Sequence, residues 1–228
     1  MSATIPNRPL PEILPVFPLT GVLLLPGTVL PLHIFEPRYR NMVEDALERD
    51  RIFGMIQPLV PQQDNRPLPG AEEQRPELYR VGCAGYIESW ERLPDGRFFL
   101  NLRGLNRFRC AEELPLHRGY RRVRADYREF PDHAPIEGWR CAREPLLSAL
   151  ADYGRARGLE VHPAQAERFT DIELINLIGV SLPFHPAEKQ ALLEAATLKD
   201  RETLLVDLLR LGARSPGGDP GSSPSSLN

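Results

Sequence analysis

The stretch that decides the fold is LPVFPLTGVLLLPGTVLPLHIFEPRY, residues 14–39, in which prolines at 15, 18, 26, 31 and 37 interrupt apolar runs. Proline removes a backbone donor and fixes its own φ, so Pro18, Pro26 and Pro31 restrict the segments between them to short strands, sheet edges or bulges. At Glu36-Pro37 the pattern changes, because proline suits the first helical turn and a nearby acidic residue complements the helix dipole. We therefore expect short strands followed by a helix over residues 37–49.

Strand patterning continues after this helix. A strand is predicted over residues 52–57, and strand character returns from Leu78, where LPDG forms the turn of a β-hairpin between Trp90 and Phe98. Alternating apolar and mixed residues follow that turn, Gly104 is expected to bend or bulge the strand, and the strand is expected to end at Cys110. With a last strand over residues 120–130, the pattern predicts a small barrel of about six strands with one helix.

Helical patterning replaces the strands after Asp132. Pro145 either kinks the first helical segment or marks a second start. The predicted helical segments are 136–157, 169–180, 186–196 and 197–211. The sequence thus predicts an α+β chain with four parts: a flexible N-terminus (1–12), a β-barrel subdomain (13–132), a helical bundle (133–211) and a disordered tail (212–228). The proline-rich polar segment 58–77 is expected to be a mobile loop.

Two separated segments carry a resemblance to a known family. FPLTGVLLLPGTVLPLHIFEPRYRNMVEDAL, residues 17–47, with FGMIQP at 53–58, resembles the opening of the substrate-binding domain of the ATP-dependent protease Lon. SLPFHPAEKQALLEAATLKDRETLLVDLL, residues 181–209, is similar to the last two helices of that domain. The resemblance implies a PUA-like barrel followed by a helical bundle. It also implies binding of unfolded or misfolded polypeptides and an ATP-dependent protease as a candidate partner.

The sequence offers little support for catalysis. No GxxxxGK[ST] phosphate loop occurs, and a Ser-Lys peptidase dyad would have to use Lys189 or Lys199, the only two lysines. Ser148 precedes Lys189 by 41 residues, but its surroundings indicate a regular amphipathic helix without a strained turn to expose a nucleophile. We expect a stand-alone binding domain without ATPase or peptidase activity.

Composition predicts a globular protein, and we expect a bacterial protein of the cytoplasm. The 228 residues are 42% hydrophobic with a net charge of -3, so no global charge favours nucleic acid or an acidic membrane. Cys83, Cys110 and Cys141 are too widely spaced for a CxxC site and are expected to be reduced and buried. The first residues lack a signal peptide, and no apolar run is long enough to span a bilayer. Five isolated histidines predict no metal site, and no cofactor is expected.

The candidate binding residues lie around the first predicted helix. An exposed apolar patch would capture polypeptides with broad specificity, because burial of apolar surface is nondirectional. The candidates are Leu30, Leu32, Phe35, Arg38 and Tyr39. For the two leucines and Phe35, packing in the core is the favoured explanation. A weak homodimer is compatible with such a patch.

An arginine-rich segment offers an alternative function. Residues 97–128 contain nine arginines against three carboxylates, with aromatic residues interleaved, as a PUA-like RNA-binding face would require. The candidate anion-binding residues are Arg103, Arg107, Arg122 and Arg124. Arginine supplies 26 of the 28 basic residues of the whole chain, however, so this richness is general. Polypeptide capture is therefore the preferred prediction over nucleic-acid binding.

Overall fold

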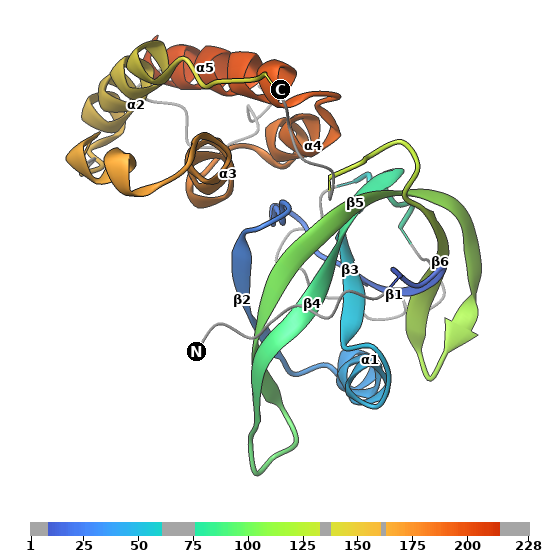
Figure 1. Ribbon diagram of the computed structural model, residues 1–228. Helices are drawn as coiled ribbons and strands as arrows, with labels where there is room; N and C mark the ends of the chain where they lie inside the picture. Colours follow the sequence, from blue (N-terminus) through green and yellow to red (C-terminus); the bar gives the residue numbers. More distant parts are fainter. Residues whose placement is uncertain (1–8, 61–75, 133–137, 161–162, 215–228) are drawn as a thin grey trace, which may run out of the picture. The chain divides into compact units, whose positions relative to one another are not determined.

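The structure is a computed structural model that describes residues 9–60, 76–132, 138–160 and 163–214. The chain divides into two compact units, residues 1–135 and 136–228. The described elements comprise a six-stranded sheet and five α-helices, so the predicted α+β class is confirmed (Figure 1). The predicted loop at 58–77 falls almost wholly outside the described residues, as do residues 1–8 of the predicted N-terminus and most of the predicted tail.

The first unit contains the sheet and one helix. Its elements are β1 (Ile13–Pro18), β2 (Val29–Ile34), α1 (Pro37–Leu47), β3 (Ile52–Ile56), β4 (Val81–Arg92), β5 (Phe98–His117) and β6 (Tyr120–Asp126). The strand order is β2-β5-β4-β3-β1-β6, and β6 also pairs with β5. Hydrogen-bonded strands therefore form a closed circuit from β5 through β4, β3, β1 and β6 back to β5. β2 stands outside this circuit and pairs with β5.

The prolines act as the sequence predicts. Pro18 ends β1, and Pro31 lies in β2, a six-residue strand at the end of the sheet order. Between them Leu25-Pro26-Gly27-Thr28 forms a tight turn, in which the Thr28 N–H donates to the Leu25 carbonyl oxygen at 3.0 Å and Gly27 has φ +83°. Proline at the second turn position and a positive-φ glycine at the third are typical of a type II turn.

The predicted hairpin and bulge are both present. In the turn that joins β4 to β5, the Leu93 N–H donates to the Arg97 carbonyl oxygen at 2.8 Å and the Gly96 N–H donates to the Leu93 carbonyl oxygen at 2.9 Å, with Gly96 at φ +82°. In the β4–β5 register Ala84 faces Asn106 and Gly85 faces Gly104, so Leu105 is the extra residue of a β-bulge. Gly104 is required there, because a Cβ at this position would lie 2.1 Å from the Leu25 carbonyl oxygen.

Several boundaries differ from the sequence-based ones. β5 is one strand that continues to His117, where a break was expected after residue 110, and β6 ends at Asp126. α1 ends at Leu47, two residues before its predicted end. The N-terminus was predicted to be flexible through residue 12, but the Glu12 carbonyl oxygen accepts a 2.8 Å hydrogen bond from the Ala125 N–H.

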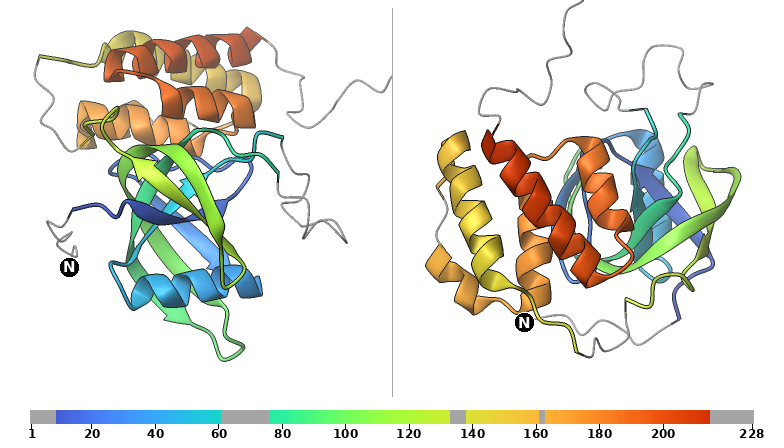
Figure 2. Two further views of the ribbon diagram at one scale, coloured as in Figure 1. Left: turned by 90° about the vertical axis from the view of Figure 1, so that its right-hand side faces the viewer. Right: turned by 90° about the horizontal axis from the view of Figure 1, so that it is seen from above.

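The second unit consists of helices. They are α2 (Arg143–Arg157), a short 3₁₀ helix (Pro163–Arg168), α3 (Asp171–Ser181), α4 (Pro186–Glu194) and α5 (Leu198–Arg214). α2 and α5 pack along each other (Figure 2). Pro145 lies in the first turn of α2, so it marks a start and makes no kink. The predicted tail began at Gly212, but α5 continues to Arg214.

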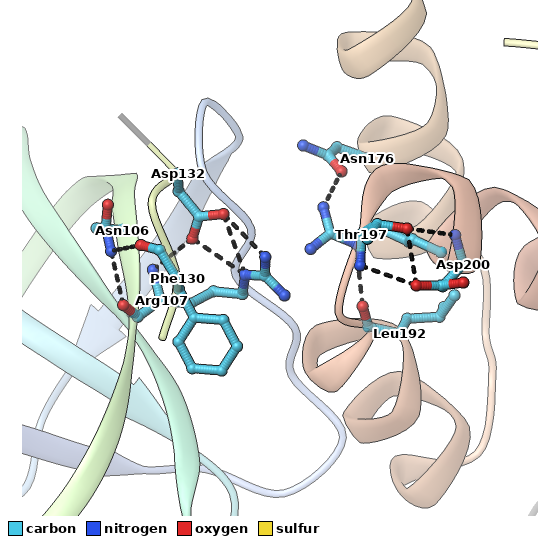
Figure 3. A network of polar contacts seen from close by, with 9 residues as sticks. Asn106, Arg107, Phe130, Asp132, Asn176, Leu192, Thr197 and Asp200 are labelled. Carbon is cyan, nitrogen blue, oxygen red and sulfur yellow. Dashed lines mark hydrogen bonds and ion pairs between the residues drawn. The ribbon is translucent and has the colours of Figure 1, made fainter. Parts of the chain in front are cut away.

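Helix capping explains where α3 and α4 begin. Thr170 and Glu173 form a capping box on α3, and His185 and Glu188 form one on α4. Each pair satisfies backbone N–H groups that have no partner within the helix. Inside this unit the buried Arg201 donates to Asn176 Oδ1 at 2.9 Å and to the Leu192 carbonyl oxygen at 3.0 Å, which joins α3, α4 and α5 (Figure 3).

Candidate functional site

The most distinctive described surface of the first unit lies on the outward face of β2, β5 and β4. The strand register places His33, Phe99 and Glu91 in one row across the three strands. Pro31, Asn101 and Ser89 form the next row on the same face, because side chains two residues apart point the same way. We call these six residues the aromatic face.

Three rings gather on and beside this face. The His33 and Phe99 rings are stacked with centroids 4.5 Å apart, and the Phe35 ring lies 5.8 Å from His33. Phe35 is 54% exposed and Phe99 is 47% exposed. Exposed aromatic side chains next to one another are a common feature of interaction surfaces, because they bury a large apolar area on contact.

A hollow of about 440 Å³ opens on the aromatic face. Its lining consists of Leu32, Trp90 and Leu100 together with the aromatic face. Asn101 Nδ2 donates to Ser89 Oγ at 3.0 Å, which fixes the polar side of the hollow. Glu91 is the only Asp, Glu, Lys or Arg residue in the lining, and no hydrogen bond or ion pair of its side chain is seen within the described residues.

The five predicted apolar-patch residues do not lie together on one surface. Leu32 and Tyr39 are buried, Leu30 and Arg38 are partly buried, and only Phe35 is exposed. Tyr39 packs against Phe17 with ring centroids 4.3 Å apart, and its burial raises the pKa of the phenol to about 12. Leu32 and Tyr39 are therefore core residues, which agrees with the core explanation for Leu32, and neither side chain contributes to an exposed patch.

The arginines of the alternative site are occupied by partners within the chain. Arg103 forms a bidentate pair with Glu88 at 2.8 Å, and Arg124 pairs with Glu112 at 3.3 Å. Arg122 donates to the Pro115 carbonyl oxygen at 3.2 Å. Phosphate binding would have to break these interactions, so this face is a poor anion site.

Arg107, the fourth alternative residue, is part of the fold itself. Its side chain is 6% exposed and forms a bidentate pair with Asp132, and its backbone N–H also donates to Asp132 at 2.8 Å (Figure 3). The guanidinium carbon lies 4.4 Å from the centre of the Phe130 ring. Asn106 Nδ2 donates to the Phe130 carbonyl oxygen at 2.8 Å. These contacts fasten residues 130–132 to β5.

Pairing extends to the other arginines of this part of the chain. Arg121, which is buried, pairs with Glu113 at 2.6 Å. The remaining pairs are Arg97–Asp95, Arg109–Glu129, Arg118–Asp45 and Arg128–Asp126. The arginine-rich segment therefore forms cross-strand and hairpin ion pairs.

The candidate catalytic groups show no reactive arrangement. Ser148 is exposed on the regular helix α2, and burial lowers the pKa of Lys189 on α4. Cys83 and Cys110 are buried free thiols, but Cys141 is partly exposed, against expectation. Burial and the neighbouring Glu202 raise the pKa of the Cys141 thiol to about 12, which opposes formation of a thiolate. Within the described ranges no three His, Cys, Asp or Glu side chains converge as metal ligands.

Sequence reasoning missed three residues of this surface: His33, Trp90 and Phe99. His33 was considered only as an isolated metal-ligand candidate, and Phe99 only as part of a mixed strand face and as one of the aromatic residues of the RNA-binding alternative. The available indication was an aromatic residue at an outward position of an alternating strand. Its neighbours across the sheet became known only with the register of β2, β5 and β4.

The six-stranded sheet and the helices define the chain as an α+β protein. Residues 13–210 match the family model of the ATP-dependent protease La (LON) substrate-binding domain. The chain belongs to this family. None of the described helices is both long and apolar enough to cross a membrane.

Similar proteins are bacterial Lon proteases. The chain is 31% identical to Lon protease of Trichlorobacter lovleyi over 205 residues, which are 88% of this chain and 24% of that protein. It is 26% identical to Lon protease 2 of Myxococcus xanthus over 208 residues, which are 88% of this chain and 24% of that protein. The chain thus spans about a quarter of the length of these relatives.

Solved structures show the same fold. The Lon N-terminal domain protein from Xanthomonas campestris matches with a TM-score of 0.55 and 22% identity, covering 86% of this chain and 96% of that one. The N-terminal domain of Mycobacterium avium complex Lon protease matches with a TM-score of 0.55 and 18% identity, covering 87% and 98%.

Proposed function

We propose that this chain recognises polypeptide substrates by burying their exposed apolar side chains against the aromatic face and the neighbouring Phe35. The observation that carries this proposal is the exposed stack of His33 and Phe99 with Phe35 beside it, in a chain of the Lon substrate-binding domain family. Burial of apolar surface requires no particular sequence, so many unfolded chains would fit. The proposed action is binding without catalysis.

We also propose an architecture, domain limits and a partner for this chain. We propose that the closed strand circuit is the small PUA-like barrel that the family resemblance implies, and that α2 to α5 form its helical bundle. The proposed domain limits remain 13–132 and 133–211. We propose cytoplasmic polypeptides as substrates and a Lon-type ATP-dependent protease as the partner that receives them. A weak homodimer through the aromatic face would compete with substrate binding.

The test measures binding of a fluorescently labelled, reduced and alkylated polypeptide that cannot refold. Full burial of one Phe side chain contributes about 1.5–3 kcal/mol, so the Phe35→Ser, Phe99→Ser double variant should bind at least about tenfold more weakly. Affinity of the unaltered chain should change little between low and moderate salt, because apolar contacts are not screened.

Leu116→Ser is the matched control, because Leu116 is an exposed apolar residue of β5 outside the aromatic face. It should bind like the unaltered chain. Circular dichroism must show that all variants remain folded. Unchanged binding by the folded double variant would overturn the proposal, and steeply salt-dependent binding of single-stranded RNA would favour the arginine alternative.

A further inference from the structure

Glu91 differs from the other carboxylates around the aromatic face. Glu88 is held by Arg103, Asp95 by Arg97, and Glu44 by Arg92 at 3.0 Å. Within the described residues Glu91 has no such partner, although it is exposed and lies on β4 next to arginine-bearing segments. The hollow therefore contains one negative charge that no cation of the described chain compensates.

The neighbours of Glu91 suit a particular ligand group. Phe99 lies directly across from Glu91 on β5, so an aromatic ring and a carboxylate stand side by side. Asn101 is the next outward residue of β5, and no described hydrogen bond uses its Oδ1 atom. A guanidinium group can stack on a ring while donating to a carboxylate and an amide oxygen, because its donors lie in one plane. A lysine ammonium can also pair with the Glu91 carboxylate, but its hydrogen bonds are less directional than those of a guanidinium.

Arg97 is a cation at the edge of the aromatic face, but within the described residues it does not pair with Glu91. Arg97 Nη1 lies 3.4 Å from His33 Nε2 at the edge of the aromatic face. Its Nε donates to Asp95 at 2.7 Å, and Asp95 also accepts from the Arg97 backbone N–H. These hydrogen bonds lower the pKa of the Asp95 carboxyl, so this pair stays ionised and its charges offset each other.

We propose that the hollow binds an arginine or lysine side chain that stands next to an apolar residue in an extended polypeptide. This inference rests on the proposed function and narrows its substrate class to basic-apolar segments. The apolar residue would lie against Phe35 and Phe99, and the cation would lie between Phe99 and Glu91. Single cation-π contacts and exposed ion pairs are individually weak, so the expected preference is about three- to tenfold.

Three unstructured labelled peptides test the inference by fluorescence anisotropy at low and moderate salt. They share two phenylalanines and two leucines and differ in carrying two Arg, two Gln or two Glu residues. The unaltered chain should bind the Arg peptide about three- to tenfold more tightly than the Gln peptide, and the Glu peptide most weakly. Added salt should reduce this preference because the ion pair is exposed.

Glu91→Gln should bind the Arg peptide about as weakly as the Gln peptide. Glu48→Gln is the matched control, since it removes an exposed carboxylate just after α1 and should keep the preference. Equal binding of the Arg and Gln peptides by the unaltered chain, or a preference that survives Glu91→Gln, would overturn the inference and leave the proposed function standing. Failure of all three peptides to bind would overturn both.

Discussion

The two halves of β5 differ in whether the charged side chains on and beside them have partners within the described chain. In the first half, outward Phe99 and Asn101 face a hollow together with Glu91, whose side chain has no partner within the described chain. In the second half, Arg107 and Arg109 are held by Asp132 and Glu129. Its arginine content makes the second half the alternative candidate for a binding surface, although arginine is abundant in the whole chain. Ion pairs within the chain argue against binding at this half, because a ligand would have to break them to reach the arginine side chains.

The largest expected difference between the two halves is between two phenylalanines of β5, Phe108 and Phe99. Phe108 is fully buried, and a Cβ at Gly54 or Gly82 would lie within 2.8 Å of its ring. Phe108→Ala should lower the free energy of unfolding by about 4 kcal/mol, since it leaves a cavity. Phe99→Ala should lower it by less than about 1 kcal/mol. Urea denaturation measures both, and equal losses would show that Phe99 is a core residue.

Removal of the Asp132 side chain tests whether an ion pair in the arginine-rich half of β5 stabilises the fold. Asp132→Ala leaves the nearly buried Arg107 guanidinium without its partner and should cost about 3 kcal/mol. Glu129→Ala, which breaks the exposed pair with Arg109, should cost at most about 1 kcal/mol. Both are measured by urea denaturation. Similar small losses in the two variants would mean that the Arg107–Asp132 pair has no structural role.

Gly104 lies where β5 passes from one half to the other. A Cβ there would meet the Leu25 carbonyl group, which is backbone and cannot rotate away, so Gly104→Ala should cost about 2 kcal/mol. The hydrogen bond from the Gly27 N–H to the Gly104 carbonyl oxygen would be strained as well, at the base of β2. Thermal denaturation measures the loss. A melting temperature equal to that of the unaltered chain would contradict this close contact.

Local chemistry made part of this fold predictable. Pro37, the LPDG turn and Thr170 each impose a backbone conformation within a few residues, and the elements that they mark are present. The continuation of β5 to His117 was missed because Glu112 and Glu113 look like a solvated break. Only their cross-strand partners Arg124 and Arg121 make them compatible with a strand.

The site was harder to predict, because its residues come together only through the pairing of separate strands. Burial of Leu32 and exposure of Phe35 depend on which face of β2 meets the core, and two-residue periodicity leaves that choice open. The row of His33, Phe99 and Glu91 joins residues from three strands through their register. A single sequence contains the residue types of such a row but not their alignment.

The smallest expected effect is at Asp126, where β6 ends beside the arginine-rich half of β5. Hydrogen bonds from the Arg128 side chain and backbone N–H hold the pKa of Asp126 at about 2, below its usual value of 3.8. The carboxyl is partly exposed to solvent, so the interaction adds only a little stability, which is present above the unfolded pKa and is lost as pH falls through about 2. Carboxyl NMR titration of Arg128→Gln should show the Asp126 midpoint rising toward 3.8, and Arg155→Gln in the second unit should leave it unchanged. An unmoved midpoint in Arg128→Gln would contradict the pairing of this arginine, and with it the argument that ion pairs within the chain occupy the arginine half.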